Sequence, residues 1–115
     1  MITIMRWNDV EMIDGKFYVV DTIDNMRFNK SSWVFAFKND NGERLTSCYV
    51  CVKNHVSSET SFCSVYGGGL ICHNNEIKNL RPATRDDMDY FWNYLDRCEY
   101  RYCLNTKKLR YVGRG

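Results

Sequence analysis

Apolar and polar residues alternate in short runs over the first two-thirds of the chain, and turn-forming residues separate the runs. Alternation with a period of two is the pattern of a β-strand, whose successive side chains point to opposite faces of a sheet. The runs predict strands at Lys16–Ile23, Ser32–Lys38, Arg44–Lys53, Ser61–Tyr66 and Leu70–Cys72. Regularly spaced short strands of this kind favour a small antiparallel β-sheet or an SH3-like barrel.

Two turn signals indicate how these strands connect. Asp14-Gly15 is a hairpin signal between the polar region Asp9–Met12 and the strand that starts at Lys16. Asn39–Gly42 consists of residues that tolerate positive φ, so the chain can reverse there into a second hairpin.

The period changes after Pro82, where the pattern predicts an α-helix. Thr84 followed by Asp87 resembles a capping box, and further aspartates crowd the first turn, where the helix dipole favours negative charge. The apolar positions then repeat at i, i+3, i+4 and i+7, at Met88, Phe91, Trp92 and Leu95. This stripe predicts a helix that packs on the sheet.

The final segment predicts a β-hairpin, with strands at Tyr100–Leu104 and Leu109–Val112 around a turn at Asn105–Lys107. The expected fold class is therefore α+β: a small antiparallel sheet or barrel, one C-terminal helix packed on it, and a terminal hairpin. Residues 1–115 should form a single domain, in which 1–80 are mainly antiparallel β and 81–112 form a helix plus hairpin module.

Composition agrees with an ordinary globular domain. The 115 residues are 44% hydrophobic and 15% aromatic, which argues against disorder. No run approaches the roughly 20 apolar residues of a membrane span, and the N-terminus lacks the pattern of a signal peptide, so a cytoplasmic protein is expected. The net charge is only +2, yet residues 97–115 carry six cations against Glu99 alone. The C-terminal end is therefore a modest basic pole.

From Leu80 to Val112 the chain resembles a C-terminal module common among uncharacterised accessory proteins of phages and prophages of gut Bacteroidales. The shared features are the start Arg81-Pro82-Ala83-Thr84, an acidic helix start, the apolar helix stripe, and an aromatic hairpin with a basic turn. The family usually carries Trp followed by Asp in the hairpin, where Tyr102 and Cys103 stand here. The resemblance implies a phage-type origin and brings no established activity.

The six cysteines raise the question of a metal site. Cys48-x-x-Cys51 is the most metal-like motif, but it lies within a predicted strand, where positions three apart face opposite sides of the sheet. No second pair with this spacing exists, although further ligands could come from Cys63, Cys72, His55 and His73. Buried reduced thiols are predicted, with neither a metal nor a cofactor.

Enzymatic activity is not expected. Cys72 and His73 are adjacent and would point apart in a strand, and His55 could reach Cys63 across a hairpin but without an evident oxyanion-hole turn. We identify no positioned set of acid, base and nucleophile.

Tyr66-Gly67-Gly68-Gly69 is the candidate ligand-binding segment. Consecutive glycines let backbone N–H groups approach a phosphate closely, and an adjacent aromatic ring can stack on a base. If the protein sequesters a nucleotide, Gly67–Gly69 would receive the phosphates, Tyr66 or Trp33 would stack on the base, and Lys53 or Arg81 would add positive charge. Three glycines also form an ordinary bulge or loose turn, so both interpretations stay open.

The preferred hypothesis is a non-catalytic, phage-type accessory protein with an anti-defence role that acts by binding. It would either sequester a host nucleotide immune signal or block a host defence protein, and a homo-oligomer could form a pocket at a subunit interface. The alternative is a small nucleic-acid-binding domain that uses the basic C-terminal hairpin around Lys107 and Lys108.

Overall fold

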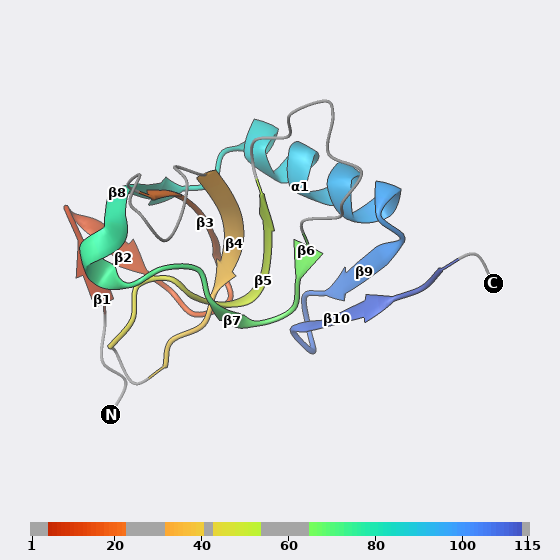
Figure 1. The fold of residues 1–115 in the computed structure, drawn as a ribbon, viewed down its shortest axis with the longest axis horizontal. Coiled ribbons are helices and arrows are strands. Elements are labelled where there is room, and N and C mark those ends of the chain that lie inside the picture. Colours follow the sequence, from red (N-terminus) through yellow and green to blue (C-terminus); the bar gives the residue numbers. More distant parts are fainter. Residues whose placement is uncertain (1–4, 23–31, 41–42, 54–64, 114–115) are drawn as a thin grey trace.

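An antiparallel sheet forms the centre of the fold (Figure 1). The computed structural model describes residues 5–22, 32–40, 43–53 and 65–113. The strands lie in the order β6-β5-β4-β3-β8, and β7 also pairs with β5. Their bounds are β3 (Phe17–Thr22), β4 (Ser32–Phe37), β5 (Ser47–Lys53), β6 (Val65–Tyr66), β7 (Gly69–Leu70) and β8 (Ile77–Pro82). β3, β4 and β5 lie where the alternation predicts strands, and the α+β class is confirmed.

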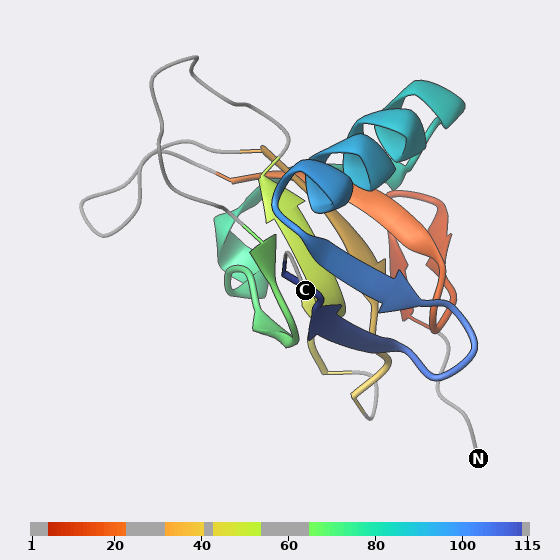
Figure 2. The same cartoon turned by 90° about the vertical axis from the view of Figure 1, so that its right-hand side faces the viewer.

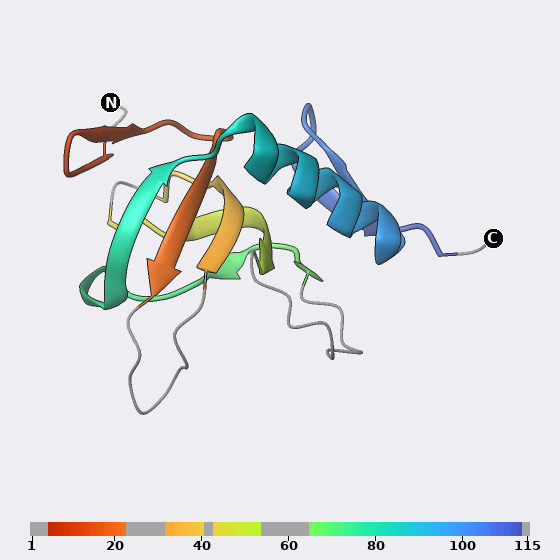
Figure 3. The same ribbon diagram turned by 90° about the horizontal axis from the view of Figure 1, so that it is seen from above.

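The central sheet is open. In the described part of the chain β6 pairs only with β5, and β8 pairs only with β3. A barrel requires its first and last strands to pair, so the alternative of an SH3-like barrel is wrong. Figure 3 shows the sheet from above as a twisted layer, with β8 along one margin.

Each face of the sheet has its own apolar cluster, because successive residues of a strand point to opposite sides. On one face Tyr18, Phe35 and Phe37 pack with side chains of the hairpin formed by β1 (Met5–Trp7) and β2 (Val10–Met12). The other face carries a row of buried valines that pack against α1 (Arg85–Arg97): Val19, Val34, Val50 and Val52. Burial of each such side chain contributes about 1.5–3 kcal/mol to folding.

The start of α1 agrees with the predicted capping box. The Thr84 hydroxyl accepts a hydrogen bond from the Asp87 amide, and the Asp87 carboxylate accepts one from the Thr84 amide. Phe91 and Leu95 are fully buried, as the stripe predicts, while Met88 is half-buried and Trp92 is 37% exposed. Part of the apolar stripe, at Met88 and Trp92, is therefore accessible to solvent.

The chain ends in a separate two-stranded sheet of β9 (Tyr100–Cys103) and β10 (Lys108–Tyr111). Tyr102 faces inward and is buried, and Leu109 packs beside it against the valine face. Figure 2 shows this hairpin next to α1 and across β5.

Three further features differ from the sequence-based expectation. Asp14-Gly15 makes a tight turn, in which the Lys16 amide donates to the Ile13 carbonyl at 3.1 Å and Gly15 has a φ of +84°. It does not form a hairpin, because β2 pairs with β1, while β3 pairs with β4 and β8. The β1–β2 hairpin itself turns at Asn8 and Asp9, both with positive φ, and β8 is a strand that the alternation did not predict.

Parts of the predicted elements lie outside the described residues: Ile23, Asn41, Gly42 and Ser61–Ser64. Within the described residues, no helix is long and apolar enough to cross a membrane.

Candidate functional site

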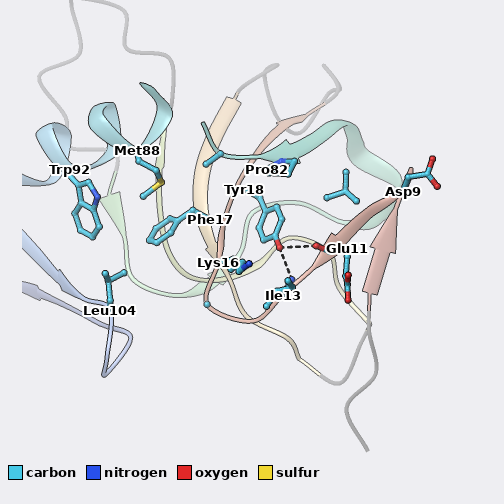
Figure 4. Close-up of a pocket in the computed structure, with 13 residues that line it drawn as sticks. Asp9, Glu11, Ile13, Lys16, Phe17, Tyr18, Pro82, Met88, Trp92 and Leu104 are labelled. Carbon is cyan, nitrogen blue, oxygen red and sulfur yellow. Dashed lines mark hydrogen bonds between the residues drawn. The ribbon is translucent and has the colours of Figure 1, made fainter. Parts of the chain in front are cut away.

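An open groove with a volume of about 690 Å³ crosses the beginning of β3 (Figure 4). Its walls come from β2 and the turn before it, the start of β3, the end of β8 with the first turns of α1, and the tip of the β9–β10 hairpin. Segments far apart in the sequence therefore build this single concavity, which we call the β3 groove.

One end of the β3 groove is apolar, where Phe17, Met88, Trp92 and Leu104 lie together. The Phe17 ring packs edge-on against Trp92, with 6.1 Å between ring centroids. Trp92 remains 37% exposed, Leu104 58% and the nearby Ile13 40%. Exposed apolar side chains that gather around a concavity are typical of a binding site.

Tyr18 holds the middle of the groove in place. Its hydroxyl donates to the Glu11 carbonyl at 3.0 Å and accepts from the Ile13 amide at 2.8 Å, which attaches the end of β2 to β3 although the two strands are not paired. Burial raises the pKa of Tyr18 above its ordinary value. The phenol therefore stays protonated at neutral pH and keeps both hydrogen bonds.

The other end of the groove is acidic. Asp9 and Glu11 are exposed there, and within the described residues neither forms an ion pair. Arg6 lies opposite Glu11 in the β1–β2 register, and Lys16 is the basic residue among those that line the groove. The arrangement can hold an apolar side chain at one end and attract a cationic group at the other.

The structure brings together three of the residues predicted to bind a ligand. Trp33 and Lys53 are direct cross-strand partners in β4 and β5, and the Trp33 and Tyr66 rings lie 5.9 Å apart between centroids. Tyr66 is 54% exposed. These residues lie at one end of the sheet, away from the β3 groove.

The glycine run connects β6 to β7, and each glycine has a structural reason to be there. A Cβ at Gly67 would lie 3.2 Å from the Leu109 side chain, so the absence of a side chain lets β10 approach closely. Gly68 and Gly69 have φ values of +95° and +113°, which other residues rarely adopt. The proposed contact of these residues with phosphate stays a prediction.

Arg81 lies apart from the other predicted ligand-binding residues. It is in β8, at the opposite edge of the sheet from β6. It pairs in register with Val19, whose side chain belongs to the α1 face, whereas Trp33 packs on the other face. Its guanidinium binds the Asp87 carboxylate at 2.6 Å. Arg81 therefore supports the start of α1.

The two thiols of the Cys-x-x-Cys motif share one core cluster, which corrects the expectation of opposite faces. The β4–β5 register shifts between Ala36, paired with Val50, and Phe37, paired with Cys48, so a bulge restores Cys48 to the face of Cys51. Both thiols are buried. A hydrogen bond between the Cys51 S–H and the Cys48 sulfur, which favours the protonated form of Cys51, and burial together raise the pKa of Cys51.

Of the other candidate metal ligands, the two that the structure describes, Cys72 and His73, do not form a metal site with this pair. Cys72 is buried beside Thr46, and His73 is exposed. Among the described residues no group of three or more His, Cys, Asp or Glu side chains is placed to hold a metal ion. His55 and Cys63 lie outside the described residues.

The β3 groove was not predicted from the sequence, although one signal was present. Leu104 is a large apolar residue beside a polar turn, where burial by local structure is not expected. The apolar stripe of the helix predicts Trp92 in the core, whereas the structure leaves part of its side chain exposed.

No protein-family model matches the sequence, and neither the curated proteins nor the solved structures gave a significant match. The function is therefore inferred from the geometry, and the phage-type resemblance of residues 80–112 stays a prediction.

Proposed function

We propose that the protein acts by binding a segment of another protein in the β3 groove, without converting it chemically. The observation that carries this proposal is the exposure of Trp92, Leu104 and Ile13 around one concavity of about 690 Å³. Tryptophan is enriched among the residues that dominate the energy of protein interfaces. A partially exposed Trp92 beside Phe17 offers a ready-made apolar site for a partner side chain.

The charges of the groove indicate the chemistry of the segment. An apolar side chain would pack against Phe17 and Trp92, and a Lys or Arg side chain would approach Asp9 or Glu11, whose carboxylates point in different directions at the other end (Figure 4). These carboxylates are exposed and form no ion pair among the described residues, so a cationic partner group would gain a complementary charge without breaking an existing pair.

The resemblance of residues 80–112 to phage accessory proteins supports a biological role for this binding. An accessory protein with an anti-defence role can act by occupying the surface of a host defence protein, and such inhibition requires affinity alone. We therefore propose a non-catalytic protein that blocks a host protein through the β3 groove in the host cytoplasm.

Selection of peptides from a displayed random library tests this proposal. We expect the enriched peptides to combine a large apolar residue with a nearby Arg or Lys, and to perturb the NMR signals of Phe17, Met88 and Trp92. Trp92→Ala should weaken binding by roughly tenfold or more, whereas Tyr111→Ala removes an aromatic side chain that is 61% exposed outside the groove and should have no effect.

A second comparison tests the charge of the partner. Glu11→Gln should weaken the binding of cationic peptides, and Glu43→Gln, which removes an exposed carboxylate elsewhere, should not. Selection of acidic peptides, or equal binding by wild type and Trp92→Ala, would contradict the proposal.

The cluster of Trp33, Tyr66 and Lys53 favours a second candidate, the sequestration of a nucleotide. A base could stack on the exposed Tyr66 ring while Lys53 contacts a phosphate. Thermal-shift screening against cyclic and linear nucleotides tests it, because a ligand at about 100 times its Kd stabilises a fold by about 2.7 kcal/mol. Tyr66→Ala should abolish such a shift, and recovery of a converted nucleotide would contradict both binding functions.

A further inference from the structure

The β9–β10 hairpin has one buried and one exposed face. Tyr102 and its register partner Leu109 point inward to the valine cluster. Strand alternation then places the neighbouring residues of both strands on the outer face, and all four of these are exposed: Arg101, Cys103, Lys108 and Arg110. The outer face of the hairpin thus carries three cations and no carboxylate.

These cations are held close to one another. Arg101 and Arg110 are direct cross-strand partners, so their Cβ atoms lie about 4.5–5.5 Å apart. Lys108 is two residues from Arg110 on the same strand, which corresponds to about 7 Å. Like charges directly opposite each other in a sheet are destabilising, and this arrangement therefore opposes the stability of the hairpin.

Within the described residues, no ion pair compensates this charge. The ion pairs among the described residues are Arg81 with Asp87 and Lys107 with Asp14, so none involves the three cations of the outer face. Lys107, at the turn of the same hairpin, differs from these three cations because its ammonium forms an ion pair with Asp14 at 2.7 Å. Of the two lysines at this turn, Lys108 is the one that contributes to the exposed basic face.

We propose that the outer face of the β9–β10 hairpin, defined by Arg101, Lys108 and Arg110, binds the phosphate backbone of a nucleic acid. A nucleic-acid strand presents one negative charge about every 3.4 Å of helix axis, so cations about 5–7 Å apart on a ribbon can each meet a different phosphate. The two arginines can each form a forked pair of hydrogen bonds with phosphate oxygens. A two-stranded ribbon also fits the major groove of a DNA duplex.

A polyanionic strand suits this face better than an acidic protein segment does. A nucleic-acid strand supplies regularly spaced phosphates that can neutralise all three cations at once. The carboxylates of a protein segment stand on flexible side chains, and binding must also order those side chains at a cost in conformational entropy. The inference goes beyond the proposed function, since this face is formed by other residues than the β3 groove and would contact a different partner.

Fluorescence anisotropy with labelled duplex DNA, single-stranded DNA and RNA of equal length tests the proposal on the full chain. Contacts to three phosphates predict a slope of about −2.7 in a plot of log affinity against log salt for the duplex. Affinity should therefore fall roughly 40-fold between 50 and 200 mM salt. The double variant Arg101→Gln with Arg110→Gln should weaken binding and reduce the magnitude of the slope by about 2.

A triple variant of matched net charge separates the local face from the charge of the whole protein. Arg44→Gln, Lys78→Gln and Arg85→Gln together remove three exposed cations from other surfaces, and this protein should keep the affinity and the slope of wild type. It is compared with the triple variant in which Arg101, Lys108 and Arg110 are all replaced by Gln, which should lose binding. Circular dichroism and thermal unfolding check that both variants fold.

Four outcomes would overturn the proposal, and the first three are no binding at low salt, equal losses in the two triple variants, and equal binding to poly-glutamate. The third would show that the face binds an acidic protein as well as a nucleic acid. A loss of nucleic-acid binding in Trp92→Ala with no loss in the hairpin variants would assign the binding to the β3 groove instead.

Discussion

Lys107 and Asp14 are 93 residues apart in the sequence, yet the Lys107 ammonium lies 2.7 Å from the Asp14 carboxylate. The same carboxylate accepts hydrogen bonds from the Asn39 amide and the Tyr49 hydroxyl. Burial alone would raise the pKa of Asp14, but the hydrogen bonds from Lys107, Asn39 and Tyr49 outweigh it and lower the pKa. This pair fastens the tip of the last hairpin to the turn before β3.

Asp14→Asn should therefore loosen the hairpin. The folded-state pKa of Asp14 is lowered, so its contribution to stability is present above the ordinary pKa of 3.8 and is lost as the pH falls through the lowered value. At neutral pH we expect faster hydrogen exchange at the Lys107 amide, which donates to the Cys103 carbonyl. Asp40→Asn, at another exposed aspartate, is the control, and equal exchange in both variants would show that the pair does not hold the hairpin.

Asp87→Asn should destabilise the protein by about 1 kcal/mol at neutral pH, because it weakens the helix cap and the ion pair with the half-exposed Arg81. The Arg81 guanidinium, helped by the Thr84 amide and hydroxyl and opposed by burial, lowers the pKa of Asp87 to about 2. Its stabilising effect is thus present above about pH 4 and is lost as the pH falls towards 2.

Urea unfolding at neutral pH and near pH 2 measures this effect. The difference between wild type and Asp87→Asn should shrink at the lower pH. Asp86→Asn changes another carboxylate of the first turn and should cost only about 0.3–1 kcal/mol through the helix dipole. A difference that stays constant with pH would contradict the assigned role of Asp87.

Phe91→Ala should cost roughly 3–5 kcal/mol, because the Phe91 ring is fully buried and its loss leaves a cavity. Trp92→Ala should cost less than half of that. Trp92 is 37% exposed, so the substitution removes less buried apolar surface and the space that it leaves is open to solvent. Chemical denaturation compares the two variants. Equal losses would mean that Trp92 belongs to the core and is not available to a partner.

Cys103 should react with thiol reagents faster than Cys48 and Cys51. It is exposed, and hydrogen bonds from the Thr106 side chain and from the Thr106 and Asn105 backbone lower the pKa of its thiol. Burial protects Cys48 and Cys51, and the pKa of Cys51 is raised. Mass spectrometry after a short alkylation at neutral pH locates the label, and labelling of the buried pair before Cys103 would disprove this order.

The parts of the fold that follow from local sequence were predictable. The cap of α1 depends on Thr84 and Asp87, three residues apart, and β3 to β5 follow from alternation within each segment. β8 was not predicted because its own sequence does not indicate a strand. It forms one through its pairing with β3. The bulge opposite Phe37 was missed for the same kind of reason, since it depends on the register of two strands.

The candidate site was harder to predict than the fold. The β3 groove joins Glu11, Phe17, Trp92 and Leu104, which come from four separate segments, and no local pattern relates them. Conversely, Arg81 was expected beside the glycine run because both carry features suited to phosphate, while the strand order places them at opposite edges. Sequence spacing could not reveal either relationship.

The open sheet also has a consequence for self-assembly. A free strand edge is a template for pairing with another chain, and fibrils can grow from such edges. β6 is only two residues long, and β8 carries exposed Lys78 and Arg81 and ends at Pro82, which has no amide hydrogen to donate. A second copy that approached β8 would meet the exposed Lys78 and an interrupted ladder at Pro82, so both margins of the sheet protect the protein against edge-to-edge aggregation.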